Sequence, residues 1–251
     1  MTDDDTQHDE QREAEAAGLV RIREQAYVDE RSADALQRYY DTPMRRPPGL
    51  MYTVVRVVLS IVAWTFFRSR ALDVDRIPAT GPVIFAPNHF SNIDHFFVAS
   101  YTRRKVQFMA KSQLYKGPFA EVMRRGGVFP VQRGRADEQS FEIARRILAR
   151  GGSVCIYSEG GRSRTGRLAD KPKRGVGRIA LESGAAVVPV AIHGSQRARN
   201  WKRLQFPRVA VRFGDPIRWD VIAEPTREQQ QAVADEIFAQ IRALYATLDE
   251  D

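Results

Sequence analysis

"VIFAPNHFSNIDHFFVASYTRR" (Val83–Arg104) begins like a strand and continues like a helix. Its first five residues form an apolar run of the kind found in buried strands. The run ends abruptly in Asn88 and His89, and an acid, Asp94, follows where a helical pattern starts. A strand that leads at once into a helix is half of a βα unit, so this stretch predicts an α/β fold.

The same alternation continues through the chain. We expect strands over residues 82–87, 105–110, 126–131, 152–158, 185–194 and 208–214. Between and after them we expect helices over His95–Thr102, Leu114–Arg125, Asp137–Arg150, Val176–Ser183 and Arg227–Leu248. This order predicts a mixed, largely parallel sheet flanked by helices. Ligands of such sheets bind at the carboxyl ends of the strands.

Charge is strongly segregated along the 251 residues. The net charge is +8, yet residues 1–41 carry −7 and residues 221–251 carry −5, so residues 42–220 carry +20. A segment this basic favours an anionic partner, which could be a nucleic acid, a lipid surface or a phosphorylated substrate. A basic, solvated face without a ligand is the simpler alternative.

An apolar run, Leu50 to Phe67, precedes the alternating region, and Arg56 is its only charge. A helix of this length is roughly 27 Å long, slightly less than a ~30 Å hydrocarbon core. An arginine near the bilayer centre would cost roughly 2.5–3.5 kcal/mol. We therefore expect a helix that lies in one leaflet, with Trp64, Phe66 and Phe67 at the interface and the flanking arginines near lipid phosphates. A buried core helix is the alternative.

Several catalytic arrangements do not fit the sequence. It has no GxSxG nucleophile elbow, and its single cysteine, Cys155, lies inside a strand-like run, so we expect no covalent acyl-enzyme. His89, Asp94, His95 and His193 could supply metal ligands. Because Asp94 and His95 are adjacent, their side chains would diverge on a helix. We predict neither a metal ion nor a bound cofactor.

Two interpretations fit the corner between His89 and Asp94. In the first, Ser91 is the helix N-cap and Asp94 interacts with the helix dipole. In the second, the chain folds back so that the carboxylate accepts a hydrogen bond from one imidazole nitrogen. The other nitrogen would then be free to take a proton from a substrate hydroxyl.

Three basic, glycine-containing stretches follow predicted strands. GGVFPVQRGR contains Arg133 and Arg135, IYSEGGRSRTGR contains Glu159 and Arg162, and KPKRG contains Lys171, Lys173 and Arg174. Each alone is typical of a solvated turn. Together they would place guanidinium groups and backbone amides at neighbouring strand ends, an arrangement that binds phosphate.

The stretches NHFSNID, GGVFPVQR, YSEGGRS and VVPVAIHG occur in that order over residues 82–216 and resemble the four blocks of the glycerolphosphate and lysophosphatidic acid acyltransferase family. The resemblance implies that His89 is the general base and that Asp94 orients it. It also implies that Arg133 is a phosphate ligand and that Glu159, Gly160 and Arg162 belong to the acceptor site. We add Asn88, Gly161 and Lys173 to the predicted substrate-binding residues. Pro130 interrupts the second block, and Ser158 and Gly161 replace the usual Pro and Thr of the third.

The resemblance implies transfer of an acyl group from acyl-CoA or acyl carrier protein to a lysophosphatidic acid-like acceptor in phospholipid synthesis. The expected partners are the acyl donor, a phosphorylated lysolipid and an anionic membrane surface on the cytoplasmic face of the cell membrane, but no nucleic acid. An acyltransferase for another lysolipid or glycolipid, or a non-catalytic lipid-binding protein, is the alternative. We divide the chain into an acidic arm (1–45), a membrane-associating helix (46–70) and an acyltransferase domain (71–251).

Overall fold

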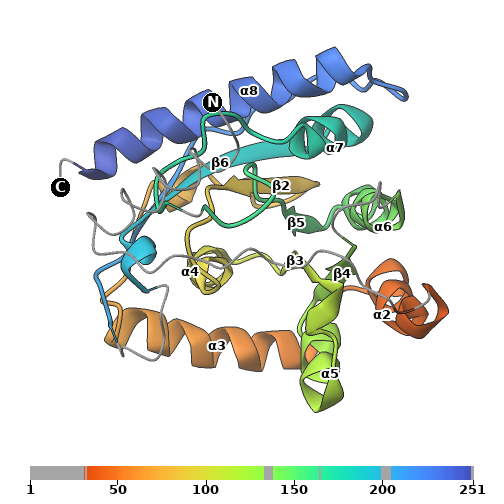
Figure 1. Cartoon of the computed structure of the whole chain (residues 1–251), viewed down its shortest axis with the longest axis horizontal. Helices are drawn as coiled ribbons and strands as arrows, with labels where there is room; N and C mark the ends of the chain where they lie inside the picture. Colours follow the sequence, from red (N-terminus) through yellow and green to blue (C-terminus); the bar gives the residue numbers. More distant parts are fainter. Residues whose placement is uncertain (1–30, 32, 133–137, 164, 199–204, 250–251) are drawn as a thin grey trace, which may run out of the picture.

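Seven strands form one sheet in the order β1-β7-β6-β2-β5-β3-β4 in this computed structural model, which describes residues 31, 33–132, 138–163, 165–198 and 205–249 (Figure 1). The strands are β1 (Arg70–Leu72), β2 (Val83–Pro87), β3 (Val106–Lys111), β4 (Val128–Val131), β5 (Ser153–Cys155), β6 (Ala186–His193) and β7 (Ala210–Phe213). All six predicted strands are present. β1 was not predicted.

The pairing is parallel except between β6 and β7, so β1 and β7 run against the other five strands. β2 lies in the middle of the sheet, between β5 and β6, with Phe85 opposite Cys155 and Val188. The predicted fold class, a mixed and largely parallel sheet with helices, is confirmed. The position of β2 matters because its carboxyl end carries Asn88 and His89 into the centre of one edge of the sheet.

The helices that flank the sheet are α2 (Ala33–Arg45), α3 (Leu50–Thr65), α4 (Asp94–Tyr101), α5 (Gly117–Arg125), α6 (Glu138–Ala149), α7 (Gly175–Ser183) and α8 (Arg227–Asp249). Short 3₁₀ turns occur at Val74–Arg76, Ser112–Leu114 and Ser195–Ala198. The five helices predicted after residue 94 are present within a few residues of their expected ends. A capping box opens α8, where Thr226 and Gln229 exchange two hydrogen bonds of 2.8 and 3.2 Å.

The sheet separates two apolar layers. Ile84 and Ala86 of β2 face a layer formed with α2, α6, α7 and α8, whereas Val83 and Phe85 face a layer formed with α3 and α4 (Figure 1). This alternation is the period of two that a strand buried on both faces requires. Gly177 lets α7 and α8 approach closely, since an added Cβ there would lie 2.0 Å from the carbonyl oxygen of Gln230.

α2 packs through Leu36, Tyr39 and Tyr40, which are buried in the first layer. Among the described residues, no single helix has the length and hydropathy to cross a bilayer. The helices Ala35–Arg45 and Leu50–Thr65 have the required length and hydropathy only when they are taken together, and their axes are bent by 91° where the two helices meet. The division of the chain at residues 45 and 70 stays a prediction.

α3 buries several polar groups and exposes a stripe of apolar side chains, although Ala63 is also buried. Tyr52 and Ser60 are buried, and the Arg56 guanidinium donates a 2.7 Å hydrogen bond to the carbonyl of Thr102 at the end of α4. Seven apolar side chains are instead about half exposed or more: Leu50, Val54, Val57, Val58, Ile61, Trp64 and Phe66.

Phe67 corrects one expectation. Its ring is 8% exposed and packs edge-on against Phe97 of α4, with 5.4 Å between ring centroids. The prediction that Phe67 lies at the membrane interface is therefore wrong. The helix ends at Thr65, so Phe67 leaves the helical periodicity and turns into the core.

Candidate active site

His89 and Asp94 form a buried pair just beyond the carboxyl end of β2. Nδ1 of His89 lies 2.9 Å from Oδ2 of Asp94. The Asp94 side chain is fully buried, whereas the His89 side chain retains 10% exposure. The chain does fold back between the two residues, as the second interpretation of this corner predicts.

Asp94 holds this turn together with a single oxygen. Oδ2 also accepts hydrogen bonds from the backbone amides of Phe90 (2.6 Å) and Ser91 (2.7 Å). The helix N-cap is Ile93, without a side-chain capping bond, so the expectation that Ser91 caps the helix is wrong. The amides of Phe90 and Ser91 lie before α4, and the carboxylate that accepts their hydrogen bonds belongs to Asp94, the first residue of α4.

This geometry fixes the state of the imidazole. An ionised carboxylate only accepts hydrogen bonds, so Nδ1 of His89 carries the proton toward Asp94. In the neutral ring Nε2 is then the acceptor nitrogen. A histidine held in this way has the arrangement of a general base with an orienting acid.

The loop after β5 surrounds the backbone of His89. The backbone amide of His89 donates a 3.0 Å hydrogen bond to Oε1 of Glu159, and the backbone carbonyl of His89 accepts a 2.8 Å hydrogen bond from the amide of Ser163. Both partners come from the YSEGGRS stretch. The structure therefore brings the first and third sequence blocks into direct contact.

Gly160 is required by the shape of this loop. Its φ is +67°, a region that side chains other than glycine rarely adopt, and an added Cβ would lie 2.7 Å from Cγ of Lys173. The amide of Lys173 donates a 2.8 Å hydrogen bond to the carbonyl of Ser158. Lys173 thus lies directly against the loop. Its role in substrate binding stays a prediction.

Tyr157 is a site residue that the sequence interpretation missed. Its ring is stacked on His89, with 3.8 Å between centroids and 19° between planes. Its hydroxyl oxygen is buried and has no hydrogen-bond partner among the described residues. Burial raises the pKa of this phenol well above its usual value, so it stays neutral. The only feature of the sequence that could have pointed to Tyr157 is its aromatic side chain directly before the SEGG stretch.

His95, next to Asp94, is a second imidazole close to the pair. Burial lowers its pKa to about 4, and the nearby His89 adds to this effect, whereas Asp94 opposes it. His95 is therefore neutral at physiological pH. Its ring lies against the rings of Phe96 and Phe108, at 4.0 and 5.6 Å.

Of the other predicted substrate-binding residues, Asn88, Gly161 and Arg162 are among the described residues and Arg133 is not. The side-chain amide of Asn88 bonds both backbone groups of Ile192 on β6, at 2.9 and 2.7 Å, and so ties two strand ends together. Gly161 and the half-buried Arg162 follow Glu159 and Gly160 in the same loop. Arg133 lies outside the described residues.

The possible metal ligands named above do not form a metal site. Within the described ranges, no group of three or more His, Cys, Asp or Glu side chains could hold a metal ion. His193 faces the ring of Tyr245 on α8, 5.4 Å away. Cys155 is buried in β5, and burial raises the pKa of its thiol well above the usual value.

Comparison with known sequences agrees with this geometry. Residues 70–193 match the family model described as Acyltransferase. The chain is 27% identical over 146 residues to the chloroplastic 1-acyl-sn-glycerol-3-phosphate acyltransferase LPAT1 of Arabidopsis thaliana, a match that covers 57% of this chain and 40% of that protein. It is 29% identical over 188 residues to the glycerol-3-phosphate acyltransferase of Alteromonas mediterranea, covering 67% of this chain and 22% of that protein. The match thus spans well under half of the length of either relative.

A solved structure has the same fold. The 1-acyl-sn-glycerophosphate (LPA) acyltransferase PlsC from Thermotoga maritima superposes with a TM-score of 0.59 and 22% identity, over 78% of this chain and 81% of that one. At this identity the likeness concerns the fold alone. The family model covers residues 70–193, from β1 to β6, and the buried His89–Asp94 pair lies at its expected place, so the chain belongs to the acyltransferase family.

Proposed function

We propose that this protein transfers a fatty acyl group from acyl-CoA or acyl carrier protein to the hydroxyl of a lysophosphatidic acid-like acceptor. The observation that carries the proposal is the His89–Asp94 pair, 2.9 Å apart at the carboxyl edge of the sheet. This edge is where ligands bind in sheets of this kind. The Arabidopsis relative is named for the same acceptor.

The reaction needs no enzyme nucleophile. The acceptor hydroxyl loses its proton to Nε2 of His89 while its oxygen attacks the thioester carbonyl carbon. Asp94 stabilises the imidazolium that forms. The carbon–sulfur bond then breaks, and the thiolate leaves and takes the proton from His89. General-base help of this kind is worth about 10²–10⁴-fold in rate.

The acceptor's phosphate is assigned to the loop that follows β5. Arg162 and Lys173 supply positive charge there. Glu159 holds the loop beside His89 by accepting the 3.0 Å bond from its amide, and Gly160 allows the turn of the loop. Arg133 is proposed as a further phosphate ligand. A guanidinium suits this role because its planar fork can bind two phosphate oxygens at once.

We also propose that the protein docks on a membrane through α3. A helix on the surface of a globular protein normally turns its apolar stripe inward. α3 does the reverse: Arg56 and Ser60 face the protein, and Val54, Val58 and Ile61 face outward. Such a stripe gains free energy when it is immersed in the interfacial region of a bilayer.

The apolar surface extends beyond α3. Phe119 and Val122 of α5 are 60% and 40% exposed, and α5 lies beside α3 at the bottom of Figure 1. Phe206 is 39% exposed and lies 5.2 Å from the ring of Phe66. We assign this surface to the cytoplasmic face of the cell membrane, where the acyl donors are found and anionic lipids attract the basic segment.

A thioester-release assay tests the proposal. The purified protein would be given acyl-CoA or acyl carrier protein with lysophosphatidic acid, glycerol 3-phosphate, a lysolipid without a free phosphate, or no acceptor. Release that requires lysophosphatidic acid and is absent in His89→Ala supports the function. Release with the phosphate-free lysolipid alone would assign another acceptor. No release with any acceptor, combined with vesicle binding, would favour the non-catalytic lipid-binding alternative.

A further inference from the structure

A cavity of about 1020 Å³ lies at the amino-terminal edge of the sheet, opposite the edge that carries His89. It opens where β3 and β5 begin, beside Lys105 and Ser153. One wall is apolar and is formed by Ile77, Pro78 and Tyr101. Pro47 and Pro48, which precede Gly49 at the start of α3, also line it. We name this space the amino-edge cavity.

Its charged lining is unbalanced. Arg103, Arg104, Lys105 and Arg150 face the cavity, whereas Asp75 is the only acid among the described residues that line it. None of the four cations forms an ion pair with a described residue. Burial without a counter-charge lowers the pKa of Arg104 and of Arg150.

Backbone carbonyls hold three of these cations in place. Arg104 donates to Ser153 Oγ (2.7 Å) and to the carbonyls of Pro78 and Gly151 (both 2.9 Å), as well as to that of Gly81. The ammonium of Lys105 donates to the carbonyl of Pro48 at 2.9 Å. Arg150 donates to the carbonyls of Pro43 and Met44.

These carbonyls are neutral, so they orient the cations without cancelling their charge. Arg103 is exposed and has no hydrogen bond to a described residue, which leaves its whole guanidinium free for a ligand. Three cations are thus held in place by hydrogen bonds, and the fourth, Arg103, is exposed.

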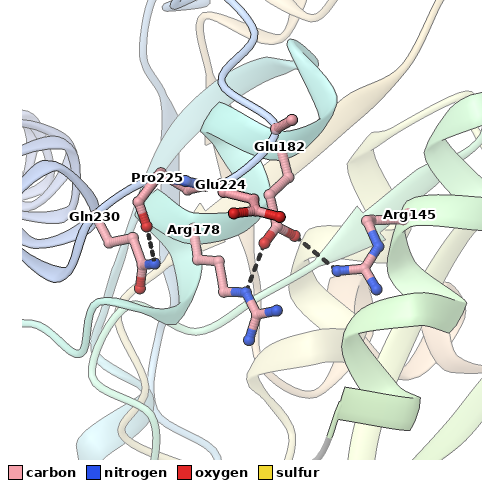
Figure 2. A pocket seen from close by; sticks show the side chains of 7 residues that line it. Arg145, Arg178, Glu182, Glu224, Pro225 and Gln230 are labelled. Carbon is pink, nitrogen blue, oxygen red and sulfur yellow. Dashed lines mark hydrogen bonds and ion pairs between the residues drawn. The ribbon is translucent and has the colours of Figure 1, made fainter.

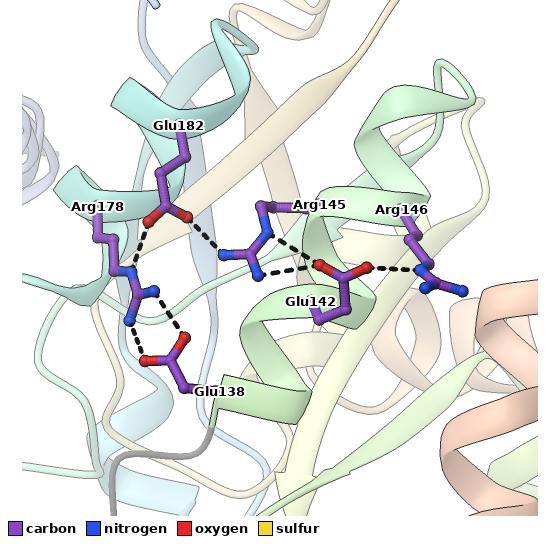
Figure 3. Close-up of polar contacts among 6 residues, drawn as sticks. All are labelled: Glu138, Glu142, Arg145, Arg146, Arg178 and Glu182. Carbon is purple, nitrogen blue, oxygen red and sulfur yellow. Dashed lines mark hydrogen bonds and ion pairs between the residues drawn. The ribbon is translucent and has the colours of Figure 1, made fainter. Parts of the chain in front are cut away.

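Another hollow of the same protein shows the opposite arrangement. The pocket between α6, α7 and the start of α8 contains Arg145 and Arg178, and both arginines bond Glu182 at 2.7 Å (Figure 2). Glu142 and Glu138 complete a chain in which every arginine has a carboxylate partner (Figure 3). There the chain neutralises its arginines itself. At the amino-edge cavity it does not.

We propose that the amino-edge cavity binds a phosphate-bearing ligand through Arg103, Lys105 and Arg150, with Arg104 as a fixed positive charge behind them. A phosphate monoester or diester offers the several anionic oxygens that guanidinium and ammonium groups bind best. The apolar wall suits a ring or a glycerol backbone attached to the phosphate. The ligand is either a soluble phosphate ester or a lipid headgroup, and it occupies a site separate from the proposed acceptor site.

Calorimetric titration of the full chain tests this site. The two probes are inorganic pyrophosphate, for soluble phosphates, and dihexanoyl phosphatidylglycerol below its micellar concentration, for lipid headgroups. The variant is Arg103→Gln/Lys105→Gln/Arg150→Gln. The matched control, Arg146→Gln/Arg218→Gln/Arg227→Gln, removes the same charge at exposed positions outside the cavity.

We expect the cavity variant to bind at least one probe about ten-fold more weakly than the wild type, and the control variant to stay within about two-fold. The probe that is lost identifies the source of the phosphate. Equal losses in both triple variants, or no binding of either probe to the wild type, would overturn the proposal. If the cavity variant does not fold, the single change Arg103→Gln replaces it, because the Arg103 side chain forms no hydrogen bond or ion pair with a described residue. An unchanged affinity of this single variant for both probes would then contradict the site.

Discussion

Oδ2 of Asp94 lies 2.9 Å from Nδ1 of His89 and also accepts the backbone amides of Phe90 and Ser91, so one oxygen orients the imidazole and closes the turn that carries it. The other oxygen, Oδ1, is buried without a hydrogen-bond partner in the described part of the chain. The two tasks of Asp94, which are to hold the turn and to stabilise the imidazolium, can therefore be separated by substitution.

His89→Ala should abolish acyl transfer and leave the fold intact. The described contacts of the side chain include the bond to Asp94 and the stacking on Tyr157, whereas the backbone bonds of residue 89 to Glu159 and Ser163 do not depend on it. The turnover number and the melting temperature should be measured together. A folded His89→Ala protein with near wild-type turnover would remove the proposed mechanism.

Asp94→Asn and Asp94→Ala should differ in stability. The asparagine oxygen can still accept both backbone amides, so Asn should keep the turn and lower turnover by about 10²–10⁴-fold through loss of the negative charge. Alanine leaves two buried amides without an acceptor, at about 1–3 kcal/mol each. Urea titration would reveal the difference. Equal unfolding free energies for the two variants would mean that the amide bonds do not hold the turn.

Tyr157 should position His89 through its ring rather than through its hydroxyl. Tyr157→Phe removes a buried hydroxyl that has no described partner, so it should keep the melting temperature or raise it and change turnover by no more than about three-fold. Tyr157→Leu removes the stacked ring and should lower kcat about ten-fold or more while leaving KM unchanged. Steady-state kinetics of both variants measure this. A larger loss in Phe than in Leu would assign a role to the hydroxyl instead.

His95 should make the protein less stable in acid. Its pKa is about 4 in the folded chain and 6.5 in its unperturbed state, so the unfolded chain binds the proton more readily between these values. Stability is therefore lost as the pH falls from about 6.5 toward 4, by about 2–3 kcal/mol at pH 4.5. His95→Phe should flatten this part of the curve in urea titrations at several pH values. Parallel curves for the two proteins would contradict the shifted pKa.

The strands could be predicted because each is a separate apolar run bounded by turn residues. β2 and β6 are fully or almost fully buried, and burial on both faces gives the continuous apolar sequence that the prediction used. β1 has three residues, of which the first is exposed and the others half-buried, so no pattern distinguishes it. It forms because β7 offers a free edge, which only the tertiary structure supplies.

The site was predictable where chemistry depends on spacing along the chain. The His89–Asp94 spacing of five residues suffices for a carboxylate to reach back to an imidazole. The stacking of Tyr157 on His89 joins two strand ends that are distant in sequence, and no local pattern encodes it. The same holds for the amino-edge cavity, which Arg103 and Arg150 both line because β3 and β5, the strands that follow them, are neighbours in the sheet.

The exposed stripe of α3 should determine membrane attachment. Val58→Ser/Ile61→Ser/Trp64→Ser removes three apolar side chains that are each about half exposed, so it should lower vesicle binding at least ten-fold and leave the fold intact. Co-sedimentation with vesicles of phosphatidylcholine and phosphatidylglycerol measures this.

A control replaces one apolar residue that is exposed elsewhere. Val221→Ser is such a change, since Val221 is 66% exposed and lies beside Gly184 at the end of α7. α7 lies on the side of the sheet opposite α3 (Figure 1). It should not affect sedimentation. Transfer to a water-soluble short-chain acceptor should be unchanged in the triple variant, because that acceptor does not require docking. Full vesicle binding by the folded triple variant would show that α3 does not face the membrane, and loss of transfer to the soluble acceptor would show that the stripe instead serves the active site.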